Sequence, residues 1–181
     1  MKKYVTLPNI ITSLRIVGTI LLFFIHPFTV AFYMIYTFCG VTDVLDGFIA
    51  RRTNSISEFG SKLDSIADLL FYSIMIIKIF PKLLEVLPMQ VWYMVAGVLI
   101  IRSAAYLLAA IKYRKFASLH TYMNKVTGLA VFSIPYFIRE PYAVMVCKVI
   151  AIIAGTAALE ELIMHIVRKE YKPGLKTILH I

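Results

Sequence analysis

The stretch TDVLDGFIARRTNSISEFGSKLDSIAD, residues 42–68, places four aspartates and two arginines between long apolar segments. Charged side chains within membrane-spanning segments are costly, so they usually line a polar pocket or pair with one another. The rest of the 181-residue chain is strongly apolar, since 60% of all residues are hydrophobic and only 16% are charged. This composition is typical of an integral membrane protein and argues against an ordinary soluble domain.

Apolar segments long enough to cross a bilayer recur along the whole chain. A spanning helix needs roughly 20 mostly apolar residues, and the two-residue alternation of a membrane strand is absent. Backbone groups in lipid are therefore satisfied within helices, and we expect an all-α membrane bundle in a single domain, 1–181. We predict six transmembrane helices, over the ranges 8–25, 28–50, 62–80, 89–111, 124–138 and 142–167.

The N-terminal segment YVTLPNIITSLR, residues 4–15, mixes polar and apolar residues ahead of the first long apolar run. We expect it to form a short interfacial amphipathic helix that runs into the first span. Thr6 and Asn9 are candidate N-caps, because their side-chain oxygens can accept from the first free backbone N–H groups of a helix.

Positive charge is distributed unevenly over the expected loops, in a chain whose formal net charge is +9. When six helices are threaded, most Lys and Arg residues fall on the side of the two termini, and only Lys78, Lys82 and Arg139 fall on the other. By the positive-inside rule, both termini and residues 42–68 face the cytoplasm of a multi-pass protein in the cell membrane. We expect the basic loops to contact anionic lipid headgroups, and we expect no nucleic-acid partner.

The spacing of the acidic residues defines two helix faces. One face follows the i, i+3, i+4, i+7 pattern and carries Asp43, Asp46, Gly47 and Ala50. The other follows i, i+4, i+8 on the next helix and carries Gly60, Asp64 and Asp68. If the turn between these helices brings them side by side, four carboxylates converge near the cytoplasmic surface of the membrane.

Converging carboxylates need a compensating cation, because like charges a few ångströms apart repel strongly in a low-dielectric site. An all-oxygen ligand set favours the hard ions Mg²⁺, Mn²⁺ and Ca²⁺. Two such ions would suit phosphoryl chemistry, since they could neutralise a pyrophosphate. Gly47 and Gly60 would let a ligand approach the backbone closely, and Arg51 could bind a phosphate through two N–H groups.

Written as a pattern, the stretch reads DxxDGxxARx8Gx3Dx3D, and all eight fixed positions are filled. The pattern resembles the motif of the CDP-alcohol phosphatidyltransferases. The segment LPNIITSLRI, residues 7–16, is similar to the N-terminal segment of the phosphatidylglycerophosphate synthase branch of that family. The resemblance implies a phospholipid-biosynthetic reaction in which CDP-diacylglycerol and an alcohol give a phosphodiester lipid and CMP. It also implies that the chain could form a homodimer.

The resemblance further implies roles for the motif residues. Asp43, Asp46 and Asp64 would be metal ligands, in a site for two Mg²⁺ or Mn²⁺ ions. Asp68 would complete the metal site and act as the general base on the acceptor hydroxyl. The CDP group would be bound by the motif residues Asp43, Gly47, Ala50, Arg51, Gly60 and Asp64.

Basic residues beyond the motif bear on the identity of the acceptor alcohol. Arg102 lies within the fourth predicted span and Lys125 opens the fifth, and both positions resemble basic residues of family members whose acceptor carries a phosphate. We hypothesise that they bind the phosphate of the acceptor, with Arg114 as a third member, which makes glycerol 3-phosphate the leading candidate. A structural ion pair is the alternative for Arg102, and a lipid-headgroup contact is the alternative for Arg114.

Two further alternatives stay open at the level of sequence. Ser65 stands where the phosphatidylglycerophosphate synthase branch commonly has proline, and a serine there resembles phosphatidylserine synthases. Serine, inositol or inositol phosphate are therefore alternative acceptors. In a different functional class, intramembrane aspartates could serve an ion or proton transporter.

Overall fold

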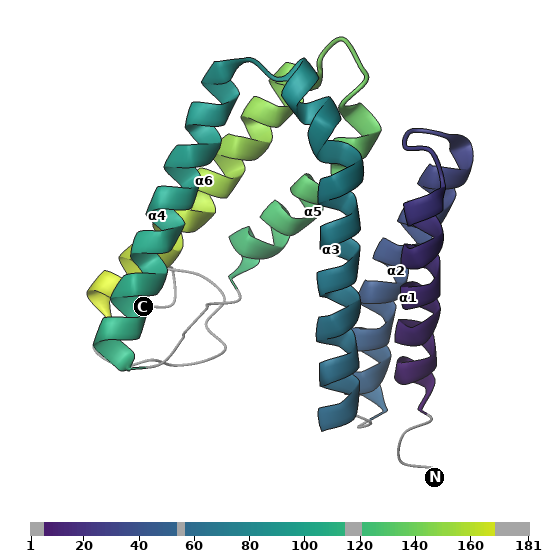
Figure 1. Ribbon diagram of the computed structural model, residues 1–181. Coiled ribbons are helices and arrows are strands. Elements are labelled where there is room, and N and C mark those ends of the chain that lie inside the picture. Colours follow the sequence, from purple (N-terminus) through teal and green to yellow (C-terminus); the bar gives the residue numbers. More distant parts are fainter. Residues whose placement is uncertain (1–5, 54–56, 115–120, 169–181) are drawn as a thin grey trace. The chain divides into compact units, whose positions relative to one another are not determined.

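The computed structural model describes residues 6–53, 57–114 and 121–168, and all regular structure within these ranges is helical (Figure 1). The described residues form six helices, which confirms the all-α prediction: α1 (Leu7–Phe24), α2 (Val30–Arg52), α3 (Glu58–Val86), α4 (Met89–Tyr113), α5 (Tyr122–Phe137) and α6 (Ala143–Val167). Four of them, α1, α2, α4 and α6, are long and apolar enough to cross a membrane. The prediction of six spans is thus supported in part, because α5 has only 16 residues and α3 carries more charged side chains.

The segment 4–15 does not form a separate helix in the described part of the chain. Its described residues belong to α1, which is continuous from Leu7 to Phe24. Thr6 is the N-cap, as its side chain accepts a hydrogen bond from the backbone N–H of Asn9 at 3.4 Å. Pro8 lies in the first turn, where its missing N–H breaks no helical hydrogen bond.

The chain divides into two compact units, Met1–Leu83 and Leu84–Ile181. In the first unit, α1 packs along α2. The two helices approach closely at Gly18, where an added Cβ would lie 3.1 Å from the Sγ of Cys39. Aromatic rings then connect α2 to α3, because Tyr36 stacks on both Phe32 and Phe71 with ring centroids less than 6 Å apart, at 5.7 and 5.6 Å. These contacts hold α3 beside the α1–α2 pair.

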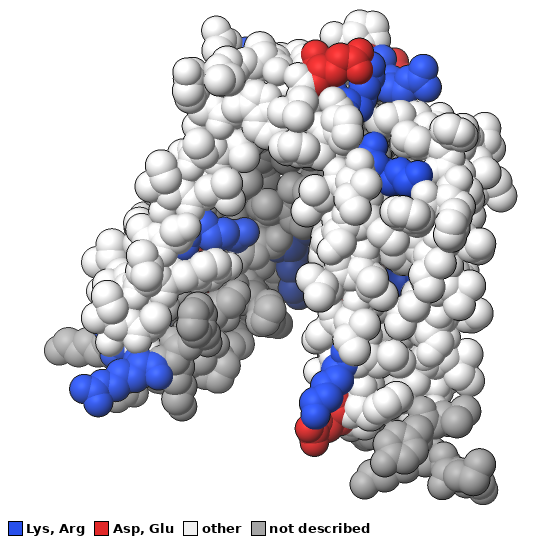
Figure 2. Space-filling model, in the orientation of Figure 1, with Lys and Arg blue, Asp and Glu red and all other residues white. Residues whose placement is uncertain are grey.

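Helix α1 buries a polar face. Its buried side chains include Asn9, Thr12, Arg15 and Thr19, whereas apolar side chains such as Leu14 are exposed. A helix that turns apolar residues outward and polar residues inward is suited to lipid on one side and to a polar site on the other. The described surface visible in Figure 2 carries few charged side chains, as expected for a protein in lipid.

In the second unit, α6 packs against both α4 and α5. Small side chains allow the close approach of α4 and α6: Ala105 and Ala109 on α4, and Ala157 and Ala158 on α6, have 0% exposure. Interfaces of small residues are common between helices in membranes, where van der Waals packing drives association.

Candidate active site

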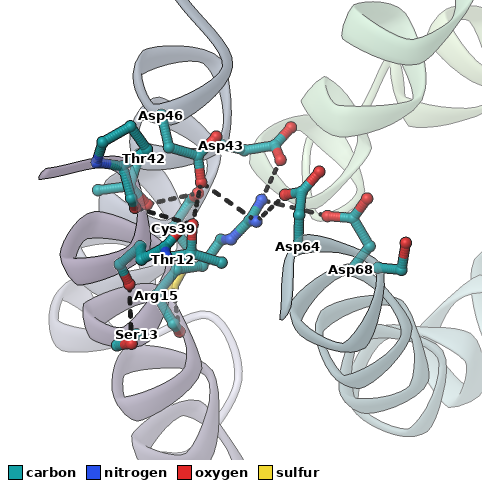
Figure 3. Close-up of polar contacts among 12 residues, drawn as sticks. Thr12, Ser13, Arg15, Cys39, Thr42, Asp43, Asp46, Asp64 and Asp68 are labelled. Carbon is teal, nitrogen blue, oxygen red and sulfur yellow. Dashed lines mark hydrogen bonds and ion pairs between the residues drawn. The ribbon is translucent and has the colours of Figure 1, made fainter. Parts of the chain in front are cut away.

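The four motif aspartates of the first unit face one another around a single guanidinium group (Figure 3). Nη1 of Arg15 donates to Asp43 and, at 3.1 Å, to Asp68. Nη2 donates to Asp64 and lies 3.4 Å from Asp46. The predicted convergence of the two acidic helix faces is therefore present, and Arg15 of α1 stands between the acids of α2 and those of α3.

The aspartates differ in exposure. The side chains of Asp43, Asp64 and Asp68 are roughly half exposed, at 48%, 47% and 44%, whereas that of Asp46 is only 7% exposed. Each of the three exposed acids offers a carboxylate oxygen, and these oxygens all lie within 4.8 Å of one another. Such a set could hold a divalent cation, because hard cations take carboxylate oxygens as ligands.

Asp46 has a different environment from the other three. Its Oδ2 accepts a hydrogen bond from the hydroxyl of Thr12 at 2.8 Å, and the Arg15 guanidinium lies beside it. Thr12 is itself buried on α1, so this contact fixes the carboxylate against the neighbouring helix. Asp46 therefore connects α2 to α1 at the edge of the acidic cluster.

A cavity of about 210 Å³ opens beside the aspartates. Five of its lining residues were predicted to bind the CDP group or metal: Asp46, Gly47, Ala50, Gly60 and Asp64. The other described lining residues are Pro8, Asn9, Thr12, Ser57 and Ser61. The side chain of Arg51, also predicted to bind CDP, lies outside the described residues.

Gly60 is required by the packing at this cavity. A Cβ at this position would lie 2.7 Å from Oδ1 of Asn9, which is closer than real Cβ contacts allow. The Asn9 side chain is almost fully buried, at 6% exposure, so it has little room to move away. The glycine of the motif thus lets the start of α3 approach α1.

Arg15 and Thr12 belong to the site, although neither was among the residues predicted for it. Both could have been found by the argument used for the aspartates, because Asn9, Thr12 and Arg15 recur every three residues in a helix that is mostly apolar. A charged residue within an apolar helix indicates a partner, and here the partners are the four aspartates.

The second unit contains a different polar cluster, around Glu161 of α6. Arg102 of α4 donates to Oδ1 of Asn124 on α5, and its guanidinium lies 3.6 Å from Oε2 of Glu161. Asn124 also donates to Glu161, at 3.2 Å, and His165 lies 4.0 Å from its other oxygen. The ion pair left open as the alternative for Arg102 is therefore present in the structure.

The other two residues predicted to bind the acceptor alcohol lie at the surface of the second unit. Lys125 is exposed, with its Nζ 6.0 Å from the centre of the Tyr122 ring. Arg114 is exposed as well and ends α4 in a left-handed backbone conformation, with φ of 52°. Binding of an acceptor by Arg102, Lys125 and Arg114 stays a prediction.

The family suggested by the aspartate motif is also the one that the chain matches among known protein families. The CDP-alcohol phosphatidyltransferase family matches residues 5–166. The chain belongs to this family. The match extends over both compact units and includes all four aspartates and Arg15. No solved structure shows significant similarity to the chain.

Curated relatives in the CDP-alcohol phosphatidyltransferase family differ in their acceptors. The chain is 31% identical over 74 residues to a CDP-diacylglycerol–serine O-phosphatidyltransferase of Methanocaldococcus jannaschii, covering 41% of this chain and 34% of that protein. It is 35% identical over 120 residues to a CMP-forming cardiolipin synthase of Rattus norvegicus, covering 64% and 37%. It is 36% identical over 87 residues to a CDP-diacylglycerol–glycerol-3-phosphate 3-phosphatidyltransferase of Rickettsia bellii, covering 45% and 48%. The matches thus span less than half the length of each of these relatives.

Proposed function

We propose that the protein transfers the phosphatidyl group of CDP-diacylglycerol to an alcohol and releases CMP, as an enzyme of phospholipid biosynthesis. The observation that carries the proposal is the set of three half-exposed carboxylates within 4.8 Å of one another, next to a cavity bordered by Gly47 and Gly60. A diphosphate could lie against the two glycines because they have no side chains. Membership of the family gives independent support.

The acidic cluster fits one or more divalent cations, with Mg²⁺ or Mn²⁺ as our proposal. Asp43, Asp64 and Asp68 offer an all-oxygen set within reach of one ion, and Asp46 could contribute after a change of rotamer. When bound, such ions would neutralise the diphosphate and favour departure of CMP. The protein itself would bind, orient and deprotonate the substrates.

We assign the proton transfer to Asp68. In the proposed reaction the acceptor oxygen attacks the phosphorus that bears the diacylglycerol group, and the bond from this phosphorus to the oxygen of the CMP phosphate breaks. The hydroxyl proton passes to the Asp68 carboxylate, which is 44% exposed and so accessible to an acceptor. A base must lie within hydrogen-bond reach of the hydroxyl that it deprotonates.

For the acceptor we propose glycerol 3-phosphate, bound by Arg102 and Lys125 with Arg114. One support is that Arg102 and Lys125 occupy sequence positions that resemble those of basic residues in family members whose acceptor carries a phosphate. A second is the relative of Rickettsia bellii, which is named for glycerol 3-phosphate. Glu161 already compensates the charge of Arg102, so phosphate binding would require Arg102 to share its N–H groups between the two anions. Serine is the acceptor in the name of the relative of Methanocaldococcus jannaschii, whereas the relative of Rattus norvegicus is named as a CMP-forming cardiolipin synthase.

An assay of CMP release tests both the reaction and the acceptor. Purified protein is supplied with CDP-diacylglycerol in mixed micelles and with glycerol 3-phosphate, serine, inositol, inositol phosphate or phosphatidylglycerol in parallel. We expect CMP only when Mg²⁺ or Mn²⁺ is present, and most with glycerol 3-phosphate. Product from serine alone would contradict the phosphate pocket. Ion flux in liposomes without CMP release would instead support a transporter.

We also propose that the whole chain acts as one domain in the cell membrane, with the aspartates on the cytoplasmic side. The charge asymmetry of the loops supports this orientation. Single cysteines placed at Lys62 and at Arg139, in a background without Cys39 and Cys147, test it in intact cells. A membrane-impermeant maleimide should label position 139 and not position 62, and the reverse pattern would contradict the orientation.

A further inference from the structure

Arg15 is a buried charged residue of a membrane helix, and its guanidinium lies at the centre of the acidic cluster. Its side chain is only 2% exposed, and its two terminal nitrogens together contact all four aspartates (Figure 3). Its Nε is buried without a hydrogen-bond partner among the described groups. The guanidinium is therefore held in place mainly by the carboxylates around it.

The same carboxylates are the ones that could hold a divalent cation. Asp43, Asp64 and Asp68 offer oxygens within 4.8 Å of one another, and each of these residues accepts a hydrogen bond from Arg15. Divalent cations bind carboxylate oxygens at about 2.0–2.6 Å, so an ion among these oxygens would occupy the space next to the Arg15 nitrogens. The two positive groups would also repel each other in a poorly hydrated site.

We propose that Arg15 is a resident counter-cation that competes with divalent metal for the acidic cluster. Before a divalent ion binds, the guanidinium holds the acids of α2 and α3 together. Binding of the ion requires Arg15 to release at least the three exposed carboxylates, so that Arg15 sets the metal affinity of the site. This inference rests on the acidic metal site of the proposed function. It adds that Arg15 lowers the affinity of that site for a divalent ion.

The Arg15→Gln variant tests two effects of the guanidinium: its competition with the metal ion and its stabilisation of the metal-free cluster. Without the competing charge, the protein should bind Mn²⁺ about tenfold more tightly or better, because one nearby unit charge is removed. Without a cation in the cluster, the metal-free protein should melt at a lower temperature, because four carboxylates then face one another uncompensated. Tighter binding together with lower metal-free stability is not expected from simple damage to the fold.

The experiment uses the full chain in detergent or nanodiscs. Mn²⁺ affinity is measured from the electron paramagnetic resonance signal of free Mn²⁺, and the melting temperature is measured with and without Mn²⁺. Lys78→Gln is the matched control, since it also removes one positive charge from the first unit, where Lys78 donates to the carbonyl oxygen of Ile25 at 3.0 Å. Its Mn²⁺ affinity should stay within about twofold of the unsubstituted protein.

The outcomes are distinct. Mn²⁺ affinity that is unchanged or weaker in Arg15→Gln would overturn the proposal, and weaker binding would make Arg15 a residue that positions the ligands. If Arg15→Gln cannot be recovered, Arg15→Lys replaces it. A lysine keeps the charge on one nitrogen and cannot bridge four acids, so tighter Mn²⁺ binding is again expected, and equal or weaker binding again overturns the proposal. An unsubstituted protein that binds no Mn²⁺ would refute the metal site of the proposed function itself.

Discussion

Each compact unit contains a polar cluster around a buried charged side chain, and the two clusters differ in charge balance. In the first unit, Arg15 is 2% exposed and is surrounded by four carboxylates, so negative charge is in excess. In the second, Glu161 has 0% exposure and faces one guanidinium, that of Arg102, so the charges balance. A cluster with excess charge can take up further ions, whereas a balanced one mainly holds helices together. We therefore expect the two clusters to respond differently to the loss of one carboxylate.

The largest effect is expected for Asp68→Asn in the first cluster. Removal of the proposed base should lower the rate of CMP release about 10²–10⁴-fold. The melting temperature of the metal-free protein should stay the same or rise, because one repelling charge is removed. Both are measured on the same preparation. Mn²⁺ binding should weaken in Asp68→Asn and in Asp43→Asn alike, because both residues belong to the proposed metal site. A large loss of stability in Asp68→Asn would show that this cluster is structural.

The opposite pattern is expected for Glu161→Gln in the second cluster. Loss of this buried carboxylate leaves Arg102 uncompensated and should lower the free energy of unfolding by about 2 kcal/mol, less than for a fully buried pair because Arg102 is still partly hydrated. Mn²⁺ affinity should be unchanged. Thermal unfolding of Glu161→Gln, Arg102→Met and the double variant measures the coupling between the two residues. Additive effects would refute the pair, since contacting residues are expected to couple.

A smaller effect is expected where the start of α3 meets α1. Gly60→Ala would place a Cβ 2.7 Å from the Asn9 side chain. Overpacking of this kind should destabilise the protein by about 1–2 kcal/mol. Because the Asn9 side chain has little room to move, the start of α3 should shift away from α1, which should distort the cavity and raise the KM for CDP-diacylglycerol. Gly97→Ala is the matched control, because nothing lies within 4 Å of an added Cβ there. If both variants behave alike, the close approach at Gly60 is unimportant.

The smallest effect is expected for Thr12→Val. This change keeps the shape of the side chain but removes the hydroxyl that donates to Asp46 at 2.8 Å. Stability should fall by about 1 kcal/mol, the usual net worth of one hydrogen bond. Thr156→Val is the control, since the exposed Thr156 hydroxyl donates only to its own helix, at the carbonyl of Ile153. Equal stability of the two variants would show that Asp46 is held without Thr12.

The acidic faces could be predicted from the sequence because helix geometry fixes which residues share a face. Spacings of three and four residues align the aspartates on each helix, and only the side-by-side placement of α2 and α3 had to be assumed. The start of α5 was predicted two residues late, at 124 instead of Tyr122. The reason is the cap, because Thr121 accepts from the backbone N–H of Asn124 and allows an earlier first turn.

The partners of buried charges could not be predicted, since they depend on contacts between distant segments. Arg15 meets Asp68 across 53 residues of sequence, and Arg102 meets Glu161 on another helix. Helical periodicity shows that such residues face inward, but it does not show which helix they face. For the same reason the hydrogen bond between Asp46 and Thr12 of another helix could not be predicted.

The position of Arg15 on α1 has a consequence for the order in which the first unit is assembled. During synthesis α1 emerges before α2 and α3, so its guanidinium enters the membrane ahead of every aspartate that will contact it. A lone arginine at the centre of a membrane helix costs about 2.5–3.5 kcal/mol on insertion scales. If α1 stayed in the translocation channel until α2 arrived, that cost would be avoided. The first two helices would then insert into the membrane together. The acidic cluster would be complete once α3 brings the last two carboxylates.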